Sequence, residues 1–449
     1  YPTGTSNAAF ITSVYENLFN RAPDAAGLAY WDGELQRGVF TKSEFILAAI
    51  NGAQNTAEGN DLAMVENKTE VGLAFADAGF DSVADAKNYL ANVTDDDATV
   101  AAALASFYSK APVAHPTRTQ AQLDAATVLS GDITSSMTLT SDKVYRISGT
   151  TKVKNGATIT IQPGTVVFGA QGEDVLVFTK GTKIMADGST NNPVIFTSET
   201  ALLDPENADA GQWGGLTILG QAPTNQANPH YEIDESDADY AFGGTNENDY
   251  SGVLRNVYVL NSGETIGTDL EINGLSLCGV GSATVVENIY IENSSDDCIE
   301  VWGGSVDITN ATMKNCQDDS FDLDFGWSGT ATNIVVQQTE VAHAGFEISS
   351  GGSAPMTSGK IVNFTINKAN GSDEGGIYIK DDTTAPTFVN GIVTTYGTDA
   401  ALNAKKAMTA NQKAAIAFKD VTLNNPTTTY GGSGATDAQQ RFEADDASY

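Results

Sequence analysis

The chain is poor in basic residues. Its 449 residues include 23 Lys and Arg against 57 Asp and Glu, which gives a net charge of −34. Nucleic-acid binding needs a basic stripe that neutralises phosphates, and binding to an anionic membrane surface also needs positive charge. The composition therefore argues against nucleic acid and against anionic membranes as partners. Strong acidity is typical of proteins that live in salt water or bind divalent cations.

Histidine, cysteine and long apolar runs are also scarce. Only three histidines are present, His115, His230 and His343, which argues against a zinc site or a histidine base. Three cysteines, an odd number, exclude a fully paired disulfide framework. Cys298 and Cys316 lie on consecutive repeats of the pattern described next, and a disulfide between them stays an open alternative. No apolar run approaches the roughly 18 residues of a membrane-spanning helix, so we expect no membrane span.

A short pattern returns along the second half of the chain. It consists of Asn or Asp, an apolar residue or Gly, a variable residue and an apolar residue. The copies begin at Asn256, Asn288, Asn310, Asn333, Asn363, Asn390 and Asp420. Alternation with a period of two predicts a strand with one buried face. Copies 22 to 32 residues apart predict stacked units without crossover helices, and therefore a parallel β-helix.

A second strand follows four of these Asn residues. Its copies span residues 298–302, 320–325, 345–348 and 376–380. Stacking them predicts two inward columns, namely Ile299, Phe321, Phe346 and Ile377, and Val301, Leu323, Ile348 and Ile379. The residues between these columns, Glu300, Asp322, Glu347 and Tyr378, must then face outward.

The outward column places three carboxylates on adjacent strands. Neighbouring strands lie about 4.8 Å apart, and like charges directly opposite one another destabilise a sheet. We expect a cation, a proton or a ligand to compensate the column of Glu300, Asp322 and Glu347. Screening by solvent and salt is the alternative.

Two acidic bends precede these strands on neighbouring turns. They are Asn293-Ser-Ser-Asp-Asp297 and Asn315-Cys-Gln-Asp-Asp319. The side chains at such bends can cap backbone N–H groups, supply hard oxygen ligands to Ca²⁺, or act as catalytic carboxylates. As a Ca²⁺ site, the candidate ligands are Asp296, Asp297, Asp318, Asp319, Glu300, Asp322 and Glu347.

The two ends of the chain differ in pattern, and the predicted fold class is α + β with more than one domain. Residues 1–112 have helical periodicity, with helices expected at 26–37, 42–53, 61–78, 83–92 and 96–109 after a first one at 10–20. A linker at 113–138, a β-helix at 139–430 and a tail at 431–449 follow. The stretch 221–252 is acidic and lacks periodicity, so it is either a cation-binding loop or a solvated excursion.

The front end resembles the DUF4214 domain family. The resemblance rests on the string from Val14 to Trp31, Val-Tyr-Glu-Asn-Leu-Phe-Asn-Arg-Ala-Pro-Asp-Ala-Ala-Gly-Leu-Ala-Tyr-Trp, and on Leu35 and Gly38. It implies an exported surface protein of bacteria, because this domain is common in surface-layer proteins and in large secreted repeat proteins. No enzymatic residue follows from it.

The second part resembles bacterial surface proteins with a right-handed β-helix of pectin-lyase-like shape. The resemblance rests on residues 213–225, 272–281, 301–304 and 318–327. That group implies a location at the cell surface more than a reaction. The string Ser295-Asp-Asp-Cys-Ile-Glu-Val301 also resembles the Asp-Asp-Cys-Ile signature of polygalacturonase-type glycosidases, in which Asp296 and Asp297 match the paired carboxylates.

The glycosidase resemblance is incomplete. The upstream Asn-Thr-Asp of those enzymes is missing, His343 is a loose match to their Gly-His-Gly one turn too far along, and no Arg accompanies Lys380. We therefore expect an extracellular structural protein of the bacterial cell surface, a surface-layer or filament subunit. Its partners would be its own copies and a lipopolysaccharide or another surface glycan, and Ca²⁺ would support assembly. The alternative is a carbohydrate-active β-helix, hydrolase or glycan-binding module, with Asp296, Asp297, Asp318 and Asp319 as catalytic carboxylates.

Overall fold

The structure is a computed structural model, of which two compact units can be described. The described residues are 5–53, 61–77, 83–96, 99–100, 103, 116–234, 236–267, 270–338, 342–351, 354–368, 374–425 and 428–446. The chain separates into the units Tyr1–Lys110 and Ala111–Tyr449, each of which is described by itself.

The first unit is helical, as predicted. Its helices are α1 (Asn7–Phe19), α2 (Ala25–Gln36), α3 (Lys42–Ala53), α4 (Asp61–Asp77) and α5 (Val83–Leu90). The side chain of Asp24 accepts a hydrogen bond from the N–H of Gly27 at 2.7 Å and so caps α2. Phe10 and Phe45 form the buried centre with a ring separation of 5.6 Å. Most of the helix expected at 96–109, and His115, lie outside the described residues.

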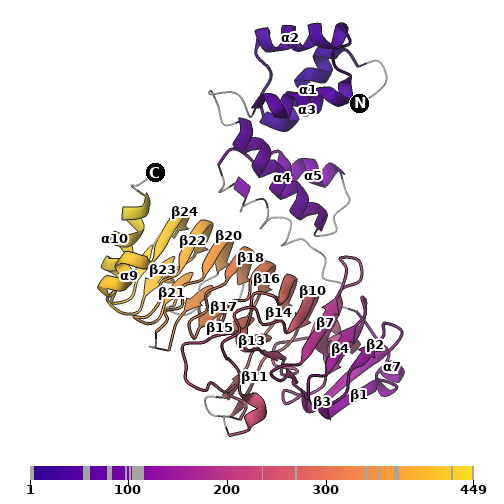
Figure 1. Cartoon of the computed structure of the whole chain (residues 1–449), viewed down its shortest axis with the longest axis vertical. Helices are drawn as coiled ribbons and strands as arrows, with labels where there is room; N and C mark the ends of the chain where they lie inside the picture. Colours follow the sequence, from indigo (N-terminus) through magenta and orange to yellow (C-terminus); the bar gives the residue numbers. More distant parts are fainter. Residues whose placement is uncertain are drawn as a thin grey trace. The chain divides into compact units, whose positions relative to one another are not determined.

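The second unit is a right-handed parallel β-helix (Figure 1). Its first turns use β1 (Thr127–Ile133), β2 (Met137–Leu139), β3 (Val144–Val153), β4 (Thr158–Ile161), β5 (Val166–Gly169), β7 (Lys183–Asp187) and β8 (Val194–Ser198). Long strands follow: β10 (Gly252–Leu260), β14 (Val285–Glu292), β16 (Ile308–Lys314), β18 (Thr330–Gln338), β20 (Lys360–Lys368), β22 (Thr387–Thr395) and β24 (Ala417–Asn424).

A sheet of shorter strands forms another face of the β-helix, which we call the short-strand sheet. It contains β6 (Leu176–Phe178), β9 (Leu216–Leu219), β13 (Leu275–Val280), β15 (Ile299–Gly304), β17 (Phe321–Asp324), β19 (Phe346–Ile348), β21 (Ile377–Ile379), β23 (Leu402–Ala404) and β25 (Tyr430–Gly431). Among the described strands, only β11 (Glu264–Gly267) and β12 (Leu270–Ile272) pair antiparallel. Short helices complete the unit: α7 (Gln120–Asp124), α8 (Glu199–Leu203), α9 (Ala410–Ala415), α10 (Ala435–Asp446) and two 3₁₀ turns, Pro205–Asn207 and Ala238–Tyr240.

The recurring Asn has a conformational cause. Each long strand bends at its motif Asn or Asp, whose φ lies between 50° and 58°, a left-handed conformation that Asn tolerates better than most residues. The Asn side chains also stack along the β-helix. The amide of Asn333 donates to the side-chain oxygen of Asn310 at 2.8 Å, and Asn363 donates to Asn333 at 3.2 Å. The motif therefore combines a bend with a ladder of amide hydrogen bonds.

The inward columns are those predicted. Ile299, Phe321, Phe346 and Ile377 are in register and fully buried, as are Val301, Leu323 and Ile348. A row of phenylalanine rings continues through the interior, with Phe346 and Phe364 at 5.4 Å and Phe364 and Phe388 at 5.9 Å. Gly391 takes the place of an apolar residue in its motif because a Cβ there would lie 2.1 Å from the Phe364 ring.

Both ends of the β-helix differ from the sequence-based boundaries. The sheet begins at Thr127, within the segment 113–138 expected to be a linker. The segment 431–449, expected to be a tail, contains α10, and Phe442 of this helix packs on Phe418 of the last long strand at 5.3 Å. Phe442 is the only large apolar residue in the sequence of α10, so apolar periodicity does not mark this segment as a helix.

Candidate cation site

The predicted outward column lies on the short-strand sheet. Strand register places Glu300 beside Asp322 and Asp322 beside Glu347, and Tyr378 continues the column. We call Glu300, Asp322 and Glu347 the acid column. Its members are not on open surface: Asp322 is 8% exposed and Glu347 is 2% exposed. The prediction of an outward column is confirmed, but solvent reaches it far less than the sequence implied.

Burial makes the acid column electrostatically unfavourable when ionised. Burial, followed by the charges of Glu347 and Glu300, raises the pKa of Asp322 well above its usual range. Glu300 also has a raised pKa, caused by burial and then by Glu232. One cation compensates part of this charge, because Lys380 Nζ lies 2.6 Å from Glu347 Oε1. The buried Oδ1 of Asp322 has no hydrogen-bond partner within the described part of the chain.

The two acidic bends hold neighbouring turns together. Asp297 Oδ1 accepts a hydrogen bond from the backbone N–H of Asp319 at 2.8 Å, and Asp319 Oδ1 accepts one from the N–H of Ala344 on the next turn. The capping role that the sequence left open is therefore present at both residues. Both have raised pKa values, caused first by burial. Asp297 and Asp319 also each form a group of close carboxylates with Asp322, so capping and ion binding are compatible.

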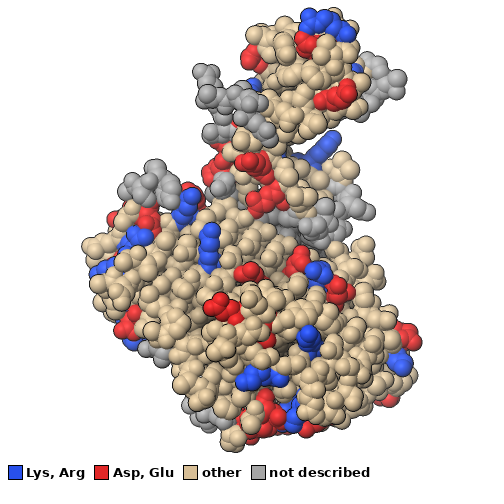
Figure 2. Space-filling model, viewed as in Figure 1, with Lys and Arg blue, Asp and Glu red and all other residues tan. Residues whose placement is uncertain are grey.

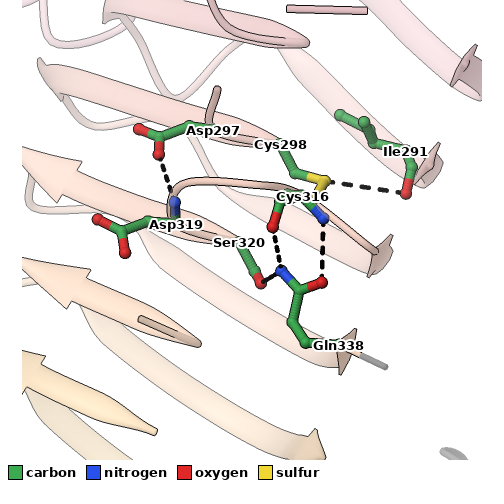
Figure 3. Close-up of a disulfide and its surroundings, with 7 residues drawn as sticks. All are labelled: Ile291, Asp297, Cys298, Cys316, Asp319, Ser320 and Gln338. Carbon is green, nitrogen blue, oxygen red and sulfur yellow. Dashed lines mark hydrogen bonds between the residues drawn. A yellow bond between two sulfur atoms is a disulfide. The ribbon is translucent and has the colours of Figure 1, made fainter. Parts of the chain in front are cut away.

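A disulfide joins the same two bends. Cys298 and Cys316 are bonded, with their Cα atoms 5.5 Å apart (Figure 3). Gln338 supports the second bend: its side-chain oxygen accepts from the N–H of Cys316 at 3.0 Å, and its amide donates to Ser320 Oγ at 2.7 Å. The third cysteine, Cys278, is free and buried. The bends are thus fixed covalently before any ligand binds.

A second column of ligand-type side chains lies at the edge of this sheet. Asp296, Asp318, His343 and Glu374 each stand three residues before the first inward residue of their strand, on four consecutive turns. We call these four residues the edge column. Asp296 and Asp318 were predicted site residues, whereas His343 and Glu374 were not predicted to belong to this column. They can be found in the sequence by aligning the strands on their first inward residue and counting three residues back, because the bends before the strands differ in length.

The edge column has its own electrostatics. Burial, followed by the charges of Glu271 and Asp318, raises the pKa of Asp296 to about 7. A hydrogen bond with Asp318 raises the pKa of His343 to about 9, against an opposing effect of burial. His343 Nδ1 forms an ion pair with Asp318 and lies 3.6 Å from Glu374 Oε2. Asp318 is therefore shared by three sets of close groups, which it forms with Glu271 and Asp296, with Asp297 and Asp319, and with His343 and Glu374.

The seven predicted metal ligands thus come together, in overlapping groups. Ligand atoms lie within 4.8 Å of one another in five groups, Asp297–Glu300–Asp322, Asp319–Asp322–Glu347, Asp297–Asp318–Asp319, Glu271–Asp296–Asp318 and Asp318–His343–Glu374. The first two consist of buried carboxylates and share Asp322. Carboxylate oxygens are ligands that hard divalent cations such as Ca²⁺ and Mg²⁺ take, so the residues present suit a cation of this class.

The comparisons with known proteins agree with this architecture. Residues 131–448, well over half of the chain, match the family described as pectate-lyase like beta helix domain. The chain belongs to this family. Residues 1–58 match DUF4214, which is described as a domain of unknown function. The chain has no match among curated proteins or solved structures.

Family membership fits a surface or carbohydrate-related protein, and the site of this pectate-lyase-like β-helix differs in detail from the glycosidase pattern. His343 pairs with Asp318, on the turn beyond Asp296 and Asp297. Lys380, which matches the glycosidase lysine, forms an ion pair with Glu347. None of the described helices has the length and apolar character needed to cross a membrane.

The stretch 221–252 is more than a solvated excursion. Tyr231 donates to or accepts from Ser276 Oγ at 2.9 Å, and Phe242 packs on Trp302 at 5.8 Å. The amide of Asn225 donates to the backbone oxygen of Ser350 at 2.7 Å. The stretch therefore covers the outer face of the short-strand sheet beside the acid column. Acidic side chains elsewhere are spread in small patches among Lys and Arg on the face shown in Figure 2.

Proposed function

We propose that this protein is an extracellular structural protein of the bacterial cell surface, a surface-layer or filament subunit, whose β-helix binds Ca²⁺ in the acid column. Copies of the chain would associate with one another, and the DUF4214 region would anchor the assembly to lipopolysaccharide or another surface glycan. Two findings support this: the β-helix family, and the pairing of His343 with Asp318 and of Lys380 with Glu347, which differs from the glycosidase set among the described residues.

One observation carries the calcium proposal. Asp322 is 8% exposed, and its buried Oδ1 has no hydrogen-bond partner among the described residues although four other carboxylates surround it. A buried ionised group without a partner costs several kcal/mol. Lys380 offsets the charge of one neighbour, Glu347. A bound divalent cation would compensate the remaining carboxylates of the column and give the free oxygen of Asp322 a ligand role.

The calcium proposal is tested by thermal unfolding of the full chain at pH 7 in EDTA and in about 1 to about 5 mM CaCl₂, at or above the dissociation constants of about 0.1–1 mM that are typical of extracellular sites. We expect Ca²⁺ to raise Tm for the natural protein and for Asp382→Asn, which removes an exposed carboxylate of the same β-helix. Asp322→Asn should lose most of this rise. An equal rise in Asp322→Asn would contradict a site in the acid column.

The assembly proposal needs its own measurement. Subunits with a net charge of −34 repel one another at low ionic strength, and bound cations reduce this repulsion at contact range. We expect sheets or filaments in negative-stain images with Ca²⁺ and soluble monomers after EDTA treatment. Assemblies that survive EDTA unchanged would reject cation-dependent assembly. Monomers under both conditions would reject the structural role.

A carbohydrate-active β-helix is the second candidate. It is favoured by Asp296, whose pKa of about 7 lies near that of a general acid, beside the pair of Asp318 and His343. The test is the release of reducing sugar from polygalacturonate by the natural protein and by the variant with both Asp296→Asn and Asp297→Asn. Activity that the double variant loses while it remains folded would favour this candidate. The structural proposal expects no activity in either protein.

A further inference from the structure

Among the described residues of the acidic cluster, His343 of the edge column supplies the nitrogen ligand. Asp318, His343 and Glu374 place a carboxylate oxygen, an imidazole nitrogen and a second carboxylate oxygen within 4.8 Å of one another. The acid column, in contrast, offers oxygen atoms alone. Imidazole nitrogen favours Zn²⁺ and neighbouring transition metals, whereas all-oxygen sets favour Ca²⁺ and Mg²⁺. The two columns therefore differ in the kind of ion that they suit.

The three edge residues are held in place by the turns of the β-helix. The N–H of His343 donates to the backbone oxygen of Asp318 at 3.1 Å, so the two residues lie on adjacent turns in fixed register. The N–H of Ala344, the next residue, donates to Asp319 Oδ1. One turn further along, Gly345 donates to the backbone oxygen of Gly375, next to Glu374, at 3.0 Å. Binding would therefore require rotation of side chains and little movement of the backbone.

Three members of the edge column are also accessible. The side chain of His343 is 52% exposed, that of Asp318 is 33% exposed and that of Glu374 is 23% exposed. An ion can reach these groups from solvent, and water can complete its coordination. Zinc sites that keep an exchangeable water have three protein ligands and leave the fourth position open. A single histidine is sufficient here because two carboxylates supply the other ligands.

The neighbouring buried charge favours a cation at this position. The ligand atoms of Asp318, Asp297 and Asp319 lie within 4.8 Å of one another. Asp297 and Asp319 are also each grouped with Asp322, whose buried Oδ1 has no hydrogen-bond partner among the described residues. Within the described part of the chain, Lys380 and His343 are the basic side chains in contact with this network. An ion at the edge would replace the proton that His343 shares with Asp318 and would add positive charge to the cluster.

We propose that Asp318, His343 and Glu374 form a second ion site, selective for Zn²⁺ or a similar divalent transition metal. It extends the proposed cation binding, but its ligands His343 and Glu374 lie outside the acid column, so either site can exist without the other. The ion bridges three consecutive turns at the sheet edge.

Co²⁺ serves as a spectroscopic substitute for Zn²⁺ in the test. The full chain is freed of metal with a chelator, and titration with Co²⁺ is followed by visible absorption, with Zn²⁺ as the competitor. His230→Gln is the matched control because His230 lies outside the cluster, with its Nδ1 3.0 Å from the backbone oxygen of Asn228. The variants His343→Gln and Asp322→Asn separate the two sites. Circular dichroism and metal-free Tm establish that each variant is folded.

We expect the natural protein, His230→Gln and Asp322→Asn to bind one Co²⁺ that Zn²⁺ displaces. Removing a group that hydrogen-bonds to a metal ligand lowers metal affinity by about 10–100-fold. Removing His343, which is itself a ligand, should therefore weaken Co²⁺ binding by more than about tenfold. The Ca²⁺-dependent rise in Tm should persist in His343→Gln.

Three results would each overturn the proposal. They are an unchanged Co²⁺ affinity in His343→Gln, no saturable Co²⁺ binding in the natural protein, and loss of Co²⁺ binding in Asp322→Asn alone. Absence of the Ca²⁺ effect with Co²⁺ binding intact would reject the calcium site and leave this one standing.

Discussion

Asp297 accepts a hydrogen bond from the backbone N–H of Asp319 at 2.8 Å and so connects two consecutive turns of the β-helix. Asp319 repeats the contact with Ala344 on the following turn. A capping carboxylate therefore supports the turn that carries the next capping carboxylate. This chain of contacts gives the bends a structural role that is independent of any ion.

Asp297→Ala should destabilise the protein because it leaves the N–H of Asp319 buried without a partner. An unpaired buried donor costs about 1–3 kcal/mol. Asp297→Asn keeps an acceptor oxygen and removes a buried charge, so we expect the metal-free Asn variant to be at least as stable as the natural protein. Urea unfolding in EDTA measures both free energies. A loss of equal size in the two variants would show that charge, rather than the cap, matters at this position.

The metal-free protein should lose stability as pH rises from about 4 to about 7. The pKa of Asp296 is raised from 3.8 to about 7, so between these values the folded chain binds more protons than the unfolded chain. The contribution of Asp296 to the free energy of unfolding is fully present below about pH 3.8 and is lost as the pH rises to about 7. Tm measured in EDTA across this range checks the slope. Asp296→Asn should reduce the slope, and a slope unchanged in that variant would assign the effect to other groups.

Removal of the disulfide should lower the free energy of unfolding by about 3 kcal/mol, the value for a closed loop of this size. Cys298 and Cys316 are separated by 18 residues. The measurement is urea unfolding of the variant with both Cys298→Ala and Cys316→Ala. Cys278→Ala, which removes the free buried thiol and keeps the disulfide, is the control. Reduction of the disulfide should lower the free energy of unfolding of this variant as it does for the natural protein. A double variant as stable as the natural protein would contradict the prediction.

Asn333 combines two roles that substitutions can separate. Its φ is 58°, and its side chain bonds to Asn310 and Asn363. Asn333→Gly keeps the left-handed backbone but loses the ladder bonds. Asn333→Ala loses the bonds and adds a conformational cost of about 1–2 kcal/mol. Thermal unfolding should therefore rank the natural protein above Gly and Gly above Ala. An Ala variant more stable than Gly would show that the backbone conformation contributes little.

Much of the β-helix was predictable because its strands obey a local rule. Alternation of apolar residues after Asn288 and Asn333 fixes which side chains face inward, and stacking then fixes the columns. The stretch 221–252 obeys no such rule. Its anchors Tyr231 and Phe242 pack against β13 and β15, which come later in the chain, so only the folded sheet reveals their role.

The candidate site was predicted in part for a related reason. Asp296 and Asp318 were visible as members of aligned acidic pairs, whereas His343 has no acidic neighbour in the sequence and the pair Asp373-Glu374 lies at a different distance from its motif Asn. Their alignment depends on bends of unequal length, which shift each residue relative to its Asn. The capping and ion-binding interpretations of Asp297 use the same residue types, so the capping contact could be recognised only from the position of the Asp319 N–H.

Helix α10 has a consequence for how copies of this chain can meet. Asp445 accepts a hydrogen bond from the N–H of Phe418 at 2.8 Å, and Arg441 donates to the backbone oxygen of Ile416. The helix thus occupies backbone groups that an incoming strand would need, and Phe442 covers the aromatic ring behind them. Growth by axial strand addition is blocked at this end, as edge protection requires. A lattice or fibre of this chain would therefore need contacts other than strand pairing at β24.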